Sequence, residues 1–144
     1  MDTTTVTLSI PYLLRDRLLA LLGDDFGFDQ EDEAEAQGVK MATFDFFDVA
    51  PELDIEQTLM DHGIPHTVRV HPGYGIEGST EHFRVHADGT PVSTAYTDSM
   101  NARMVTLDEL FEARAKGVGA IDQLLNEKDN EHPVLNWNAQ LEIL

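Results

Sequence analysis

The stretch VHPGYGIEGSTEHFRVH holds the residues of this chain whose types and spacing most suggest chemistry. Gly73, Gly75 and Gly78 form a G-x-G-x-x-G pattern, which in a dinucleotide-binding fold surrounds the pyrophosphate at the start of a helix. His82 and His86 follow with the spacing of two zinc ligands on adjacent helical turns. The same stretch also fits a β-hairpin, in which the glycines supply turn conformations.

The residues around the glycines favour the hairpin. A dinucleotide site needs a helix at the last glycine, whereas S-T-E-H-F-R-V-H after Gly78 alternates in polarity like a strand. On a strand that rises about 3.3 Å per residue, His82 and His86 lie about 13 Å apart, too far to share a zinc ion with bonds of about 2 Å. We therefore predict no cofactor, no metal site and no catalytic residue here.

A hairpin would instead gather cationic side chains on one face of a sheet. In adjacent antiparallel strands, Thr67-Arg69-His71 and His82-Arg84-His86 would share the polar side. The sequence thus predicts a sheet-face cationic patch that either balances nearby acidic residues or docks an anion, an acidic partner or a second copy of the chain. Its members are Arg69, His71, His82, Arg84 and His86.

An enzymatic alternative stays open for the same stretch. Carboxylates and imidazoles could act together as general acid and base, so a small hydrolase or ligand-binding domain could use His71, Glu77, Glu81 and His82 around the glycine loop. Acid–base catalysis needs a positioned pair in a pocket, and the sequence shows only proximity along the chain. The sequence therefore leaves enzymatic activity undecided and leans towards a non-enzymatic protein.

Charge is the dominant feature of the composition. The 144 residues include 27 Asp and Glu against 9 Lys and Arg, for a formal net charge of −18. Such a charge disfavours direct binding of nucleic acid or anionic membranes and favours a partner with a basic surface, while solubility or salt adaptation would also explain it. We expect one domain over residues 1–144 and, because neither a secretory signal nor a membrane span is visible, a cytoplasmic protein.

The acids concentrate in DDFGFDQEDEAEAQG, residues 24–38, which the composition predicts to be a mobile, exposed loop. A row of carboxylates of this density could imitate nucleic-acid phosphates and bind the basic groove of a partner. The candidate partner-binding residues are Asp24, Asp25, Asp29, Glu31, Asp32, Glu33 and Glu35.

Hydrophobic periodicity predicts an α+β fold. Strand patterns cover residues 5–10, 39–47, 67–71, 79–86 and 92–97, and helical patterns cover 11–22 and 51–62. Two short helices, or one broken helix, follow over 106–114 and 121–125, separated by Gly117 and Gly119. We expect a mixed or antiparallel sheet of about five strands with helices on one face, and the leading topology for the first half is a ferredoxin-like, split β-α-β arrangement. The apolar tail, residues 133–144, should pack on the body through Trp137, or form a homodimer contact.

The segments TFDF, HGIPHT, HPGYGIEGSTEHFRVHADG and HPVLNWNAQ together resemble a group of small proteins carried by proteobacterial phages, plasmids and integrative elements. The group typically has G-I-P/A-Y/F-D, a glycine-rich G-x-E-Y-G-x-G-T-E-Y and a late P-L-P-W-D-N-Q. This chain departs at His66 and Thr67 and at the asparagines that flank Trp137. The resemblance implies a mobile-element context and no transferable catalytic residue.

Charge and context together predict an accessory protein that binds a host protein, as a nucleic-acid mimic or inhibitor of a restriction, CRISPR-type or DNA-binding protein. The alternatives are the small-ligand-binding domain or hydrolase described above, and a homomeric assembly component.

Overall fold

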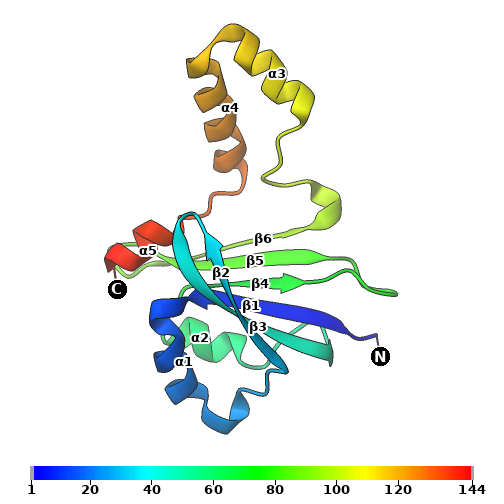
Figure 1. Ribbon diagram of the computed structural model, residues 1–144, viewed down its shortest axis with the longest axis vertical. Coiled ribbons are helices and arrows are strands. Elements are labelled where there is room, and N and C mark those ends of the chain that lie inside the picture. The colour runs from blue at the N-terminus through cyan, green and yellow to red at the C-terminus, as the bar shows by residue number, and fades with distance from the viewer. Residues whose placement is uncertain (1, 144) are drawn as a thin grey trace.

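The computed structural model describes residues 2–143 and forms one sheet with helices on both of its faces (Figure 1). The strands are β1 (Thr4–Pro11), β2 (Gln30–Ala36), β3 (Val39–Val49), β4 (His66–Val70), β5 (Ser79–Val85) and β6 (Pro91–Thr97). The helices are α1 (Arg15–Leu22), α2 (Glu56–Asp61), α3 (Leu107–Lys116), α4 (Val118–Glu131) and α5 (Trp137–Ile143), with short 3-10 turns at Tyr12–Leu14, Gly23–Asp25 and Asp98–Met100. The predicted α+β class is confirmed.

The sheet has the strand order β2-β3-β1-β4-β5-β6, and each neighbouring pair is antiparallel. In the first half, α1 connects β1 to β2 and α2 connects β3 to β4, while β1 lies between β3 and β4. This is the split β-α-β arrangement that the sequence predicted. β5 and β6 then extend the sheet beyond β4.

The main core lies between the sheet and helices α1 and α2. Val6, Leu8 and Ile10 of β1 are fully buried, because period-two alternation puts all three on the side of the helices. Leu18 of α1 and Leu59 of α2 belong to the same cluster and are also fully buried. The opposite face of the same strands carries Thr7 and other polar residues, so it is left available for a site.

The sequence missed one strand. Residues 30–36 were predicted to lie in a loop, but they form β2, paired along its whole length with β3. Gln37 and Gly38 form the two-residue connection, and both have positive φ, 55° and 76°, which suits the right-handed twist of a hairpin. An edge strand can carry this many acidic residues because most of its side chains are exposed to water. Within residues 2–143 the sheet therefore has six strands rather than about five.

The helices also do not all lie on one face. Trp137 of α5 is buried against Val39 and Met41, on the face opposite α1 and α2. The Asn136 side chain accepts a hydrogen bond from the Ala139 N–H and caps α5, while the Gln140 amide bonds both the N–H and the C=O of Val85. The tail thus packs on the body, as expected, and Trp137 and Gln140 make the contacts that hold it there.

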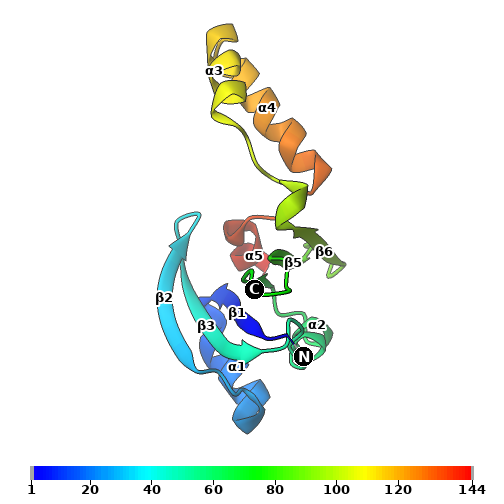
Figure 2. The same ribbon diagram turned by 90° about the vertical axis from the view of Figure 1, so that its right-hand side faces the viewer.

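Helices α3 and α4 form a hairpin that projects beyond β6, away from the rest of the molecule (Figures 1 and 2). We call residues 107–131 the arm. The predicted capping box is present, since the Thr106 hydroxyl accepts from the Glu109 N–H and the Glu109 carboxylate accepts from the Thr106 N–H. Across residues 2–143, no helix combines the length and apolarity that crossing a membrane requires.

A titratable group beneath the sheet gives the fold a pH dependence. Burial, and next the charge of Glu81, raise the pKa of Glu56 on α2 to about 7. The folded protein therefore holds a proton on Glu56 at pH values where the unfolded chain has released it. Stability is lost as pH rises from the unfolded value of about 4.5 towards 7.

Replacing Glu56 by Gln, which resembles the protonated carboxyl, should raise the melting temperature at pH 8 and leave it nearly unchanged at pH 4.5. Thermal unfolding of both proteins across this range measures the difference. Glu112→Gln, at an exposed position of α3, is the matched control and should show no such trend. A gain from Glu56→Gln that is the same at both pH values would contradict the assignment.

Candidate functional site: a groove on the open face of the sheet

Strand register brings most of the predicted cationic patch together. Thr67 pairs with His82 and Arg69 with Thr80, so Arg69, His82 and Arg84 share the face that α1 and α2 leave open. His71 follows β4 and its Nε2 lies 2.9 Å from the Thr7 hydroxyl on the same face. His86 lies past the end of β5, exposed in the turn to β6, and takes no part.

Arg84 forms the floor of this face and is only 3% exposed. Its guanidinium lies 3.6 Å from the centre of the Trp137 ring and donates to the carbonyls of His66, Phe83 and Leu135 at 2.8 to 3.0 Å. No carboxylate in residues 2–143 pairs with it, and burial lowers its pKa to about 10, which leaves it charged at neutral pH. Arg84 is therefore a buried cation whose charge is stabilised by carbonyl dipoles and the Trp137 ring rather than by a carboxylate.

A hydrogen-bond relay runs from Arg84 across the face. Arg84 Nη2 donates to the Thr67 hydroxyl, which lies 2.9 Å from His82 Nδ1, and His82 Nε2 lies 2.8 Å from the Tyr96 hydroxyl. A neutral imidazole donates from one ring nitrogen and accepts at the other, so these two hydroxyls engage both nitrogens of His82. Burial, and next the nearby Arg84, lower the pKa of His82 to about 4, in agreement with a neutral ring.

A second arginine is held at the rim. Arg69 forms a two-pronged ion pair with Asp98, at 2.5 and 3.0 Å, which lowers the pKa of Asp98. Asp98 lies against Gly78, where an added Cβ would come within 2.1 Å of its carboxylate oxygen. Gly78 thus makes room for the ion pair, while Gly75, with φ of 78°, provides the turn.

The glycine-rich stretch is therefore the connection between the antiparallel strands β4 and β5, as the hairpin interpretation predicted. The alternative catalytic set does not converge. Glu81 pairs with Val68 on the helix side of the sheet, His82 lies on the open side, and Glu77 accepts a hydrogen bond from the Ser99 N–H. No cluster of residues in 2–143 has the composition of a metal site.

A groove of about 780 Å³ lies on the open face, a size suited to a small organic ligand, and its lining includes Arg69, His82, Arg84 and Tyr96. The ends of β2 and β3, helix α5 and the segment 97–104 form its walls. Beside the cations and Tyr96, the lining includes apolar side chains such as Met41, Met104 and Trp137. The sequence predicted the cationic floor but missed the walls, because these come from segments far apart in the chain.

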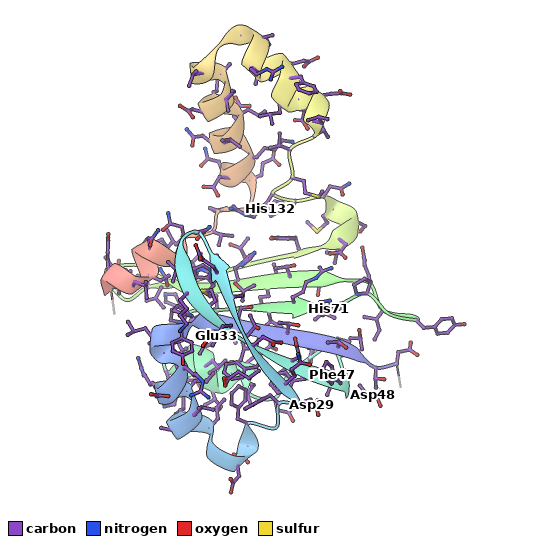
Figure 3. All side chains as sticks on the ribbon, viewed as in Figure 1. Asp29, Glu33, Phe47, Asp48, His71 and His132 are labelled. Atoms are coloured by element: carbon purple, nitrogen blue, oxygen red, sulfur yellow. The ribbon has the colours of Figure 1, made fainter. Side chains whose placement is uncertain are left out.

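The acidic residues lie elsewhere and are split among elements. Asp24 and Asp25 lie in a 3-10 turn, and Asp29 accepts from the Phe47 N–H at the end of the β2–β3 ribbon, with Glu33 farther along it (Figure 3). Alternation along β2 puts Glu31, Glu33 and Glu35 on the opposite face from Asp32. Arg15 pairs with Glu31 and Lys40 with Glu33. The predicted single row of seven carboxylates is thus not continuous.

No family model, curated protein or solved structure matches this chain, so its function is argued from the site itself.

The close approach of Asp98 to Gly78 generates a prediction about stability. Gly78→Ala should destabilise the protein by about 1–3 kcal/mol, because the new methyl group must displace Asp98 from Arg69. Gly119→Ala is the control, since it lies in α4 with nothing within 4 Å, and it should stabilise by about 0.5–1 kcal/mol. Urea unfolding measures both, and equal effects of the two changes would refute a packing role for Gly78.

Proposed function

We propose that the protein is a non-enzymatic binding protein whose groove takes an amphipathic organic anion, such as a carboxylate with an apolar chain. The observation that carries the proposal is the buried Arg84, which lacks a carboxylate partner within residues 2–143, on the floor of an open groove. Its charge gives the groove a positive potential inside a protein of net charge −18. Apolar walls and the Tyr96 hydroxyl would bind the rest of the ligand.

The protonation states support binding rather than catalysis. Both nitrogens of His82 are engaged, and its pKa of about 4 leaves it a poor general base near neutral pH. Asp98, the one carboxylate that residues 2–143 contribute to the groove lining, is held by Arg69 and has a lowered pKa. The groove therefore offers hydrogen-bond donors and positive charge without a free base.

Octanoate, octylammonium and 1-octanol test the ligand class, because they share a chain and differ in charge. Trp137, the sole tryptophan, lines the groove, so its fluorescence reports binding directly. Octanoate should give a saturable change, and the ammonium should give none. Equal binding of all three compounds would show an apolar surface without anion selectivity.

Two substitutions should shift octanoate affinity in opposite directions. Asp98→Asn frees Arg69 and should tighten binding about tenfold, and Arg69→Gln should weaken it about tenfold, since a charged hydrogen bond contributes about 1.5–3 kcal/mol. Arg17→Gln on α1, outside the groove, makes the same chemical change as a control and should have no effect. Shifts of the same sign for both groove variants would contradict the electrostatic argument.

A second function rests on the acidic edge strand. β2 ends the sheet on one side and carries carboxylates on both faces, which suits contact with a basic surface. We propose that this edge allows the protein to bind a basic host protein, as an accessory protein of a mobile element that mimics nucleic acid or inhibits a DNA-binding or nuclease partner.

Amide substitution of Asp24, Asp25, Asp32 and Glu35, four exposed acids of residues 24–38 without a Lys or Arg partner in the described chain, tests this second function. Asp29 is kept because it accepts from the Phe47 N–H. Capture from a proteobacterial lysate at low salt should retain a basic nucleic-acid-binding protein on the native chain and lose it on the variant. The same change at Asp108, Glu112, Glu127 and Glu131 of the arm alters net charge equally and should preserve capture. If the captured protein is the same after the acidic substitutions and at higher salt, nucleic-acid mimicry is excluded.

A further inference from the structure

The arm lacks a core of its own. α3 has 10 residues and α4 has 14, yet Ala113 is the one buried residue of α3 and α4 has none. Helices of this length are marginal in water unless an apolar face is packed. The two helices pack against each other, and the Lys128 ammonium lies 3.4 Å from the Glu109 carboxylate across the hairpin.

The two broad faces of the arm differ in polarity. One face, around a small hollow between the helices, carries mainly charged and amide side chains, including Glu112, Lys116, Gln123 and Glu127. The other face carries large apolar residues at helical spacing. We call this set the apolar face of the arm; it consists of Leu107, Leu110 and Phe111 of α3 with Val118, Ile121 and Leu125 of α4.

The apolar face is open to solvent. Five of its six side chains have exposed fractions between 38% and 76%. Both helices contribute to it, so it continues across the hairpin rather than forming a narrow stripe on one helix. A two-helix hairpin with one such face has the form of half a four-helix bundle.

We propose that two copies of the chain associate through this face and complete a four-helix bundle. A two-fold axis would bring each apolar face against its own copy, which is the contact of a symmetric dimer. The ionisable residues that share these helical spacings are Arg114, Asp122, Lys128 and Asp129, two of each sign. Arg114 lies over the Phe111 ring at 5.1 Å, Lys128 pairs with Glu109, and Asp129 pairs with Arg103. The face is thus neutral within a strongly acidic protein, so copies can meet there without like charges opposed.

The projection of the arm favours a second copy for a further reason. Each chain carries a net charge of −18, and two sheets in direct contact would repel strongly. The arm extends away from the sheet (Figures 1 and 2), so contact through its outer face can keep the acidic bodies apart. At physiological salt, where the screening length is about 8 Å, the remaining repulsion is small.

The size of the face sets the expected affinity. Helices of this length, about 15 and 21 Å long and 8–10 Å apart, present a face roughly 20 Å on each side. This is below the roughly 800 Å² per partner of a standard interface, so we expect a dissociation constant in the micromolar range. Association should strengthen with salt, because salt screens repulsion between the bodies and leaves apolar contact intact.

Sedimentation equilibrium of the full chain between about 1 and 200 μM tests the proposal, with the dimer expected in the upper part of this range. Leu125→Lys should abolish the dimer, and its added positive charge lowers the net repulsion between copies. Gln123→Lys is the control, because it makes the same change in charge on the polar face of the same helix. Lysine favours helix at both positions, and circular dichroism checks that the arm stays folded.

Three results would overturn the proposal: a monomer at every concentration, a dimer that survives Leu125→Lys, or equal loss of the dimer in both variants. Weakening of the dimer by salt would also contradict the proposal, because salt weakens contacts between opposite charges rather than apolar contacts. The groove and the acidic strand play no part in this contact, so the outcome is independent of the functions proposed above.

Discussion

The stack of the Arg84 guanidinium on the Trp137 ring is the contact on which the rest of this structure depends. Arg84 donates to carbonyls of β4, of β5 and of the segment before α5, so a single side chain joins the sheet to the C-terminal helix. A buried guanidinium is costly unless its donors are satisfied, which is why these carbonyls and the Trp137 ring surround it. The same arrangement leaves a positive charge under the groove.

Charge is separated by the two faces of the sheet. Apolar strand residues face α1 and α2, and the cationic residues face the groove, because both sets follow the period-two alternation of the strands. The acids are placed mainly on an edge strand, in turns and on the arm, where water solvates them. A net charge of −18 therefore coexists with a local positive site.

Much of the fold follows from local patterns, and the missing parts have identifiable causes. Strong alternation in β1 and β3 and the glycines after α1 and α2 sufficed to predict the split β-α-β half. β2 was missed because five of its seven residues are polar and its pairing depends on the Gln37–Gly38 turn, which lacks the usual Asn or Asp. The floor of the groove could be predicted from strand register. Its walls could not, since Ala34, Met104 and Trp137 meet only after tertiary packing.

Arg103 connects the groove to the base of the arm, so a rearrangement of one affects the contacts of the other. Arg103 lines the groove, pairs with Asp129 of α4 and donates to the His132 carbonyl at 2.8 Å, where the chain returns from the arm (Figure 3). The His132 ring in turn packs edge-on against Tyr96, with 6.0 Å between ring centres. An anion that drew Arg103 into the groove would have to release Asp129 and loosen the base of the arm. A substitution at Arg69 therefore removes the ion pair with Asp98 in the groove, whereas one at Arg103 removes the ion pair with Asp129 at the base of the arm.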